Sequence, residues 1–152
     1  MPLEGGAKML VELRARARKY KSRTASVGFF NPEYASLALF MEFGFNNAAT
    51  GHFVAPRPFF RLTIKNEKEK WAKRLLNQLK GSRGKNSTDA MKNVATLMRD
   101  DVKLYILSAF LYNPNKERTV KKKGFNRPLY ETGRLSRKVT FRLTAMKGST
   151  LG

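Results

Sequence analysis

His52 is the single histidine of the sequence and could in principle act as an acid or a base near neutral pH. A histidine works in nucleophilic catalysis beside a nucleophile and an orienting group, and no nucleophile-elbow sequence accompanies this one. Among the carboxylates, Asp100 and Asp101 are adjacent, so they point in different directions on a helix. Glu67 and Glu69 lie among lysines, as on a solvated helix face. These residues form no catalytic constellation, and we predict that the protein is not an enzyme.

The stretch GSRGKN, residues 81–86, has only part of the pattern of a phosphate-binding loop. Leu79 stands where the first glycine of that pattern is required, and Asn86 replaces the hydroxyl residue that would bind magnesium. A helical pattern rather than a strand precedes the stretch, which favours a flexible linker. The sequence has no cysteine, so disulfides and thiolate metal sites are excluded. We therefore expect no cofactor and no metal ion.

The elements that would position any site follow from the apolar periodicity of the first half of the chain. Residues 9–20 fit both a helix and a strand, and their alanines and arginines favour the helix. TASVGFF, residues 24–30, is β-branched and aromatic, which predicts a strand. Asn31 and the proline after it are typical of a helix start, and the apolar pattern that follows ends at Gly44. Residues 45–58 show no periodicity, which predicts a loop.

Two longer helices are predicted next. The first begins at Phe59 and stops at the linker, with an apolar face of Ile64, Trp71, Leu75 and Leu79. The second runs from Thr88 to about Tyr112 and carries a broad apolar stripe. Its members are Val94, Leu97, Met98, Val102, Tyr105, Ile106 and Ala109.

Near the end of the sequence, Thr132 and Gly133 predict a turn before a final strand. Glycine takes a positive φ at low cost, and the threonine hydroxyl can brace the turn. After the turn, apolar Val139, Phe141 and Leu143 alternate with polar residues, so one face of this strand would enter the core. The turn would set the register of the strand, because a slip by one residue reverses its faces.

This order of elements predicts an α+β fold in one small domain, a short antiparallel sheet packed on two or three helices. The length of 152 residues suits a single domain. We divide it into a basic N-terminal segment (1–23), a core (24–144) and a flexible tail (145–152). No segment is apolar over the length of a membrane span, and no signal-peptide pattern is found.

The charge is the strongest compositional feature. Lysine and arginine number 31 against 11 for aspartate and glutamate, a net charge of +20. Such a charge indicates a polyanionic neighbour or a solvated surface that repels its own copies. No zinc-finger, helix-turn-helix or aromatic RNA-binding signature accompanies it, so any nucleic-acid contact would be with the backbone. We assign interface or polyanion contact to Arg57, Arg118, Lys121, Lys122, Lys123 and Arg127.

Three stretches together resemble one protein family. They are SVGFFNPEYASLALFMEFG (26–44), APRPFFRLTIKNEKEKW (55–71) and TVKKKGFNRPLYETGRLSRKVTFRL (119–143). Their order and spacing are similar to those of the tailed-bacteriophage neck and tail-completion family, also described as virion morphogenesis or minor tail proteins. The chain departs from that pattern at Tyr130-Glu131, at Arg137-Lys138 and in a longer segment over 45–54.

The resemblance implies a virion structural protein that forms a ring of identical subunits at the head–tail junction or the tail end. Its partners would be neighbouring connector, neck or tail-tube proteins, with no membrane. The basic face would either line a channel that holds packaged DNA or pair with an acidic neighbouring ring. The chain would be made in the host cytoplasm and located in the virion. The alternative is a sequence-nonspecific nucleic-acid-binding protein that contacts phosphates through its basic surface.

Overall fold

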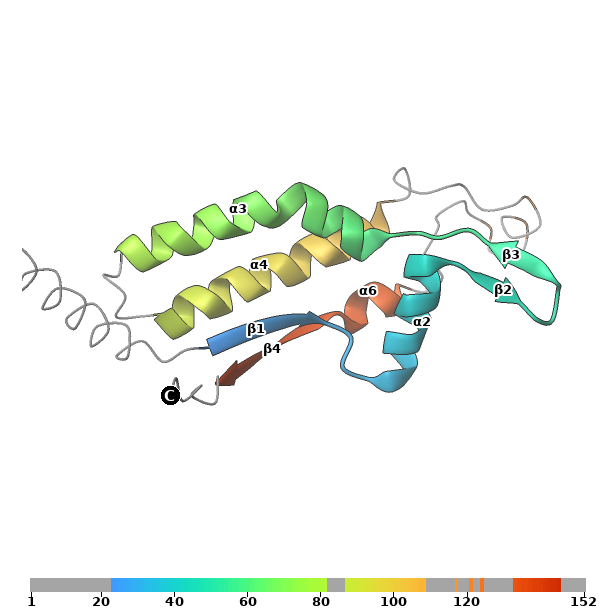
Figure 1. Ribbon diagram of the computed structural model, residues 1–152, viewed down its shortest axis with the longest axis horizontal. Coiled ribbons are helices and arrows are strands. Elements are labelled where there is room, and N and C mark those ends of the chain that lie inside the picture. Colours follow the sequence, from blue (N-terminus) through green and yellow to red (C-terminus); the bar gives the residue numbers. More distant parts are fainter. Residues whose placement is uncertain are drawn as a thin grey trace, which may run out of the picture.

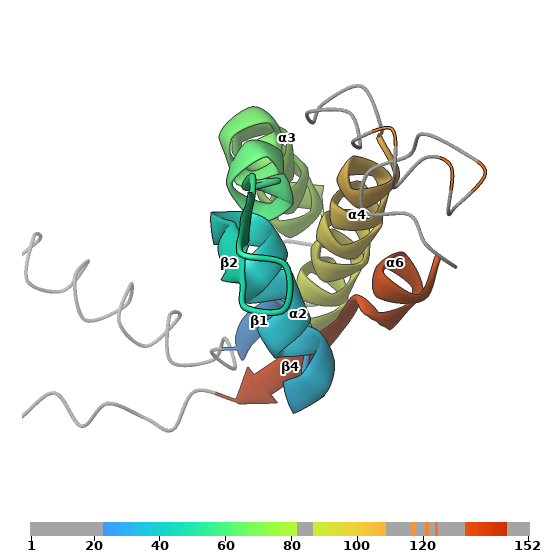
Figure 2. The same ribbon diagram turned by 90° about the vertical axis from the view of Figure 1, so that its right-hand side faces the viewer.

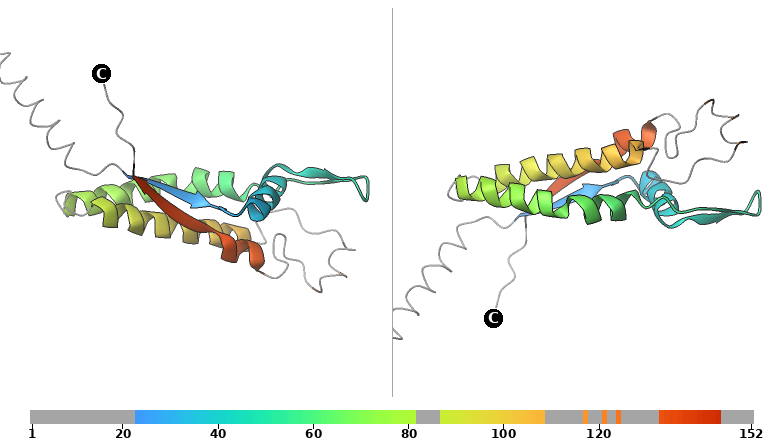
Figure 3. Two further views of the ribbon diagram at one scale, coloured as in Figure 1. Left: turned by 90° about the horizontal axis from the view of Figure 1, so that it is seen from below. Right: turned by 90° about the horizontal axis from the view of Figure 1, so that it is seen from above.

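Two long antiparallel helices, covered on one face by a two-stranded sheet, form the body of the protein (Figures 1 and 3). The computed structural model describes residues 23–81, 87–108 and 133–145, with Glu117, Lys121 and Gly124 between them. The helices are α3 (Phe59–Gly81) and α4 (Ser87–Leu107), and the strands are β1 (Arg23–Gly28) and β4 (Thr140–Ala145). The α+β fold predicted from the sequence is confirmed. The helix expected over residues 9–20 lies outside the described residues.

The sheet joins segments that are far apart in the sequence. β1 and β4 are antiparallel, with Arg23 opposite Ala145 and Gly28 opposite Thr140. The paired strands therefore reach one residue beyond each end of the segment 24–144 that was predicted to form the folded part of the domain. The predicted alternation in β4 is confirmed. Apolar positions 139, 141 and 143 are buried or half-buried, whereas positions 140, 142 and 144 are exposed. The apolar face of the sheet therefore packs on the helices.

The turn predicted at Gly133 is present, and a helix that the sequence reading missed follows it. Gly133 has φ 66° and ψ 9°, in the left-handed region, so the predicted positive φ is confirmed. The chain then forms α6 (Arg134–Lys138) before it enters β4. Leu135 and Val139 are four residues apart, a spacing that suits one short helical turn. The prediction placed Val139 in the final strand, and it is instead the C-cap residue of α6. Thr132 lies outside the described residues.

The helix α2 (Pro32–Phe43) begins and ends as the sequence predicts. The Asn31 side-chain oxygen accepts a hydrogen bond from the Glu33 amide at 2.9 Å, and Pro32 occupies the first turn. At the other end, the Gly44 amide donates to the Phe40 carbonyl at 2.9 Å. In Figure 2 this helix lies across the end of the α3–α4 pair.

The prediction of a loop over residues 45–58 is wrong in part, because a hairpin forms there. Its strands are β2 (Phe45–Asn47) and β3 (His52–Val54), and it projects beyond the helices (Figure 1). The Asn47 side chain accepts from the Ala49 amide at 3.0 Å and so stabilises the turn. Strands of three residues are too short to show a period, which explains the error.

Two details of the long helices also differ from the predictions. Ile64 is 51% exposed rather than on the core face of α3. α4 ends at Leu107, five residues before the predicted end. The Ser108 amide donates to the Tyr105 carbonyl, three residues back, and its hydroxyl donates to the Leu104 carbonyl, so the last turn is tightened. Residues 109–112 of the predicted helix lie outside the described part of the chain.

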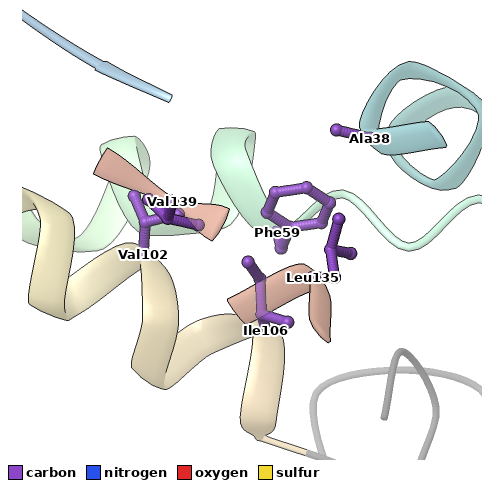
Figure 4. Close-up of a cluster of buried hydrophobic side chains, with 6 residues drawn as sticks. All are labelled: Ala38, Phe59, Val102, Ile106, Leu135 and Val139. Carbon is purple, nitrogen blue, oxygen red and sulfur yellow. The ribbon is translucent and has the colours of Figure 1, made fainter. Parts of the chain in front are cut away.

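The core lies where α2, the start of α3, the end of α4 and α6 meet (Figure 4). Phe59 is fully buried at its centre, between side chains of all three neighbouring helices. Its ring meets the Phe29 ring edge-on at 6.4 Å between centroids. The buried members of the cluster are Ala38, Phe59, Val102, Ile106, Leu135 and Val139.

A buried carboxylate holds the two long helices together away from this core. Asp101 of α4 accepts from the indole Nε1 of Trp71 at 2.6 Å and from the Lys70 ammonium at 2.9 Å. Lys70 also pairs with Glu67. A buried carboxylate is stable only when charged or polar partners surround it, and α3 supplies both partners.

Candidate functional site

The joint between α2 and α3 is made by Glu42, which is buried although it carries a charge. Its carboxylate accepts the backbone amides of Phe60 at 3.0 Å and Arg61 at 3.1 Å, in the first turn of α3. It also accepts from the Arg61 side-chain Nε at 2.9 Å, and the Glu42 carbonyl accepts from the same guanidinium at 2.7 Å. Glu42 therefore caps the α3 N-terminus from a different helix, where free amides and the helix dipole favour an anion.

The hairpin is held against the end of α2 at Gly44. This residue has φ 76°, and a Cβ there would lie 2.7 Å from the Val54 carbonyl oxygen and 3.1 Å from the Phe53 ring. A side chain would therefore push β3 away. Beyond the hairpin, the Arg57 amide donates to the Met41 carbonyl at 2.7 Å. Both ends of the hairpin are thus attached to α2.

The outer surface of α2 and the hairpin carries large apolar side chains. Leu39 is 58% exposed, Phe43 60% and Phe53 58%, and Leu37 and Phe40 are exposed as well. The Phe40 ring lies 5.4 Å from that of Phe45, so the apolar surface continues from the helix onto β2. We call these five exposed side chains the apolar face. A helix that is apolar on all sides is usually buried on all sides.

A groove of about 330 Å³ lies beside this apolar face, between α2 and the start of α3. Apart from Glu42 and Arg61, which lie in the joint, its lining is hydrophobic. The hydrophobic residues are Phe29, Ala35, Ala38, Leu39, Phe43 and Phe60. The Arg61 guanidinium lies 4.9 Å from the centre of the Phe43 ring, so these two lining residues form a cation–π contact. The lining of the groove suits apolar packing.

The structure places few of the contact residues predicted from the sequence. Arg57 was expected to be presented to a partner, but it is half-buried, and burial lowers the pKa of its guanidinium below the ordinary value. Its Nη1 lies 3.8 Å from the Met41 sulfur. Lys121 is exposed. Arg118, Lys122, Lys123 and Arg127 lie outside the described residues.

Sequence reasoning missed the apolar face, although a signal for it was present. The segment from Leu37 to Phe43 is almost continuously apolar, and one core-facing stripe cannot use all of these side chains. His52 lies exposed on β3. Within the described residues, no group of three or more histidines, aspartates or glutamates gathers as a metal site would require.

Comparisons with known proteins found no match: no protein-family model, no curated protein and no solved structure is similar to this chain. Among the helices of the described part of the chain, none combines the length and apolar character needed to cross a membrane.

Proposed function

We propose that this chain is a structural subunit of a tailed-bacteriophage virion, one copy in a ring at the neck or at the end of the tail. The observation that carries the proposal is the apolar face on α2 and the hairpin. Four of its five side chains belong to the first of the three stretches that resemble the neck and tail-completion family, so the resemblance and most of the exposed surface coincide in the sequence.

The size of the apolar face supports a contact with another subunit. Large apolar side chains bury about 150–250 Å² each when covered. Because these five side chains are about half exposed, they present roughly 500 Å² of apolar surface to solvent. This area is at the upper end of the largest apolar patch found on a typical monomer. One side of a standard protein interface covers about 800 Å². The apolar face would therefore supply more than half of one such side.

A closed ring needs two different surfaces on each subunit, because its contacts run head to tail. A second exposed apolar pair, Leu104 and Leu107, lies at the end of α4. We propose that the apolar face of one subunit packs on this pair in the next. Two three-residue strands are marginally stable by themselves in water, and the neighbour would cover the hairpin.

The test is incorporation of purified subunit into tail tubes or into heads that carry a connector, measured by sedimentation. Leu39→Ser with Phe43→Ser should abolish incorporation, with a small change in melting temperature because both side chains are already more than half exposed. Leu76→Ser is the control, since Leu76 is equally exposed but lies on α3 away from the groove. Wild-type incorporation of the double variant would refute the proposal.

The net charge adds a condition to assembly. Copies with a charge of +20 repel one another, so we propose that the purified subunit stays monomeric at low salt and forms the ring on a scaffold. Charge reversal at Lys121, Lys122 and Lys123 should impair incorporation at an unchanged melting temperature. The alternative function, a free sequence-nonspecific nucleic-acid-binding protein, predicts instead that neither tail tubes nor connector-bearing heads incorporate the subunit, whatever its affinity for DNA.

A further inference from the structure

A second hollow, of about 700 Å³, lies between α3 and α4 and has a polar lining. α3 contributes Lys73, Arg74, Asn77 and Gln78 to it, and α4 contributes Asn93 and Thr96. None of its lining residues in the described part of the chain is a carboxylate. We call this hollow the basic groove. Its character is opposite to that of the apolar groove beside α2.

The helix geometry explains why these side chains meet. Positions 70, 73, 74, 77 and 78 follow the three- and four-residue spacing of one helix face, so neighbours along this face have Cβ atoms about 5–6 Å apart. On α4, Asn93 lies opposite the buried Val102 in helical projection, and Val102 belongs to the core near the sheet. The basic groove therefore opens away from β1 and β4. Figure 3, seen from above, shows this face of the helix pair with no other described element over it.

The charge of the basic groove is uncompensated over most of its length. At one end Lys70 pairs with Glu67 and Asp101, so its charge is neutralised. Farther along, Lys73 and Arg74 are both exposed, and neither forms a salt bridge with any residue that the structure describes. Two cations that have no salt bridge within the described residues, beside amide and hydroxyl groups, form a surface for an anionic ligand with several acceptor oxygens.

We infer that the basic groove binds the phosphodiester backbone of nucleic acid without reading its sequence. Lysine, arginine, asparagine, glutamine and threonine are the side chains that contact phosphate and sugar oxygens, and together they form nearly all of the lining. Among the described lining residues, Leu97 alone is apolar, and none has an aromatic ring on which a base could stack. Acidic peptide motifs are usually recognised by clusters of arginines. The described lining of this groove contains a single arginine, Arg74, so it favours nucleic acid over an acidic peptide. The inference concerns a single subunit and does not rest on the ring.

The experiment measures binding of the full chain to a 20-base-pair duplex of arbitrary sequence over a range of salt concentrations. Lys73→Gln with Arg74→Gln removes both cations. Each phosphate contact contributes about 0.9 to the slope of log K against log salt. The double variant should therefore lose about two from that slope, and bind roughly 60-fold more weakly at 0.1 M salt. A second variant, Asn77→Asp, adds a carboxylate to the groove and should also weaken binding.

Lys65→Gln with Lys68→Gln is the matched control, because both lysines are exposed on the other side of α3 and the loss of charge is equal. It should change the slope by less than one. Lysine acetylation footprinting gives a second readout, in which the duplex should protect Lys73 but not Lys65. Equal losses in the two double variants, or no protection of Lys73, would overturn the inference. So would loss of poly-glutamate binding with unchanged duplex binding, which would show that the groove takes an acidic polypeptide instead.

Discussion

Replacement of Glu42 by alanine should destabilise the protein more than replacement of any exposed glutamate, because one buried carboxylate satisfies three nitrogen donors. Two of them, the amides of Phe60 and Arg61, lie in the first turn of α3 and would lose their acceptor. A hydrogen bond to a charged group contributes about 1.5–3 kcal/mol, and loss of a helix cap costs about 0.5–2 kcal/mol. The Arg61 side chain is 57% exposed, so its ion pair adds little.

Because these terms overlap, we expect Glu42→Ala to lower the free energy of unfolding by about 3 kcal/mol. Glu42→Gln keeps one acceptor oxygen and should lower it by about 1–2 kcal/mol. In a chain of this size, 3 kcal/mol corresponds to a fall of roughly 10 °C in melting temperature. The assay is urea unfolding followed by far-ultraviolet circular dichroism, together with hydrogen exchange at the two amides.

The control is Glu69→Ala, since Glu69 lies on α3, the helix that Glu42 caps, but is exposed and forms no ion pair with the described residues. It should change the unfolding free energy by less than 0.5 kcal/mol, as surface substitutions usually do. If Glu42→Ala is as mild as the control, or if the Phe60 and Arg61 amides exchange at wild-type rates in it, the capping role is wrong.

Three further predictions concern stability. Phe59→Ala should lower the free energy of unfolding in urea by about 3–5 kcal/mol, because it leaves a cavity at the centre of the core. A decrease of less than about 1 kcal/mol would show that Phe59 is not at the centre of the core. Gly133→Val should lower the melting temperature far more than Gly133→Asn, since asparagine tolerates a left-handed conformation and a β-branched residue does not; equal effects would contradict the turn geometry. Burial acts to lower the pKa of Lys70, but its bonds to Glu67 and Asp101 raise it above the ordinary value. The stabilisation from this raised pKa is complete below about pH 10.4 and is lost as the pH rises through the folded-state pKa. Lys70→Met should therefore reduce the loss of unfolding free energy at alkaline pH. If the unfolding free energy of this variant falls with pH as it does in the wild type, the raised pKa is wrong.

The sequence predicts the elements whose ends carry local signals. Asn31 and Gly44 delimit α2, and the alternation after position 138 identifies β4, because in each case neighbouring residues determine the conformation. The role of Glu42 could not be found in this way. Its partners lie eighteen and nineteen residues later, and the sequence shows only an isolated acid in an apolar run.

The two grooves were beyond sequence reasoning for a related reason. Each one lies between two helices, so its lining depends on the rotation and crossing of both. Periodicity places Lys73 and Arg74 on one face of α3, but it cannot say that Asn93 of α4 lies across from them. The contact residues around Lys121, Lys122 and Lys123 were predicted from charge alone. A row of charged residues in the sequence does not show which other residues lie beside it in the fold.

The pairing of β1 with β4 has a consequence for how the chain is made. The α3–α4 pair is local in sequence and can form early, whereas β1 has no partner until β4 has left the ribosome. At about 5–20 residues per second, synthesis from Arg23 to Ala145 takes roughly 6–24 s. During that interval β1 is an unpaired strand edge, and the β4 of another nascent copy fits it as well as its own. The rate at which ribosomes initiate translation, more than the stability of the folded core, should therefore determine what fraction of the chains avoids strand exchange and aggregation in an overexpressing cell.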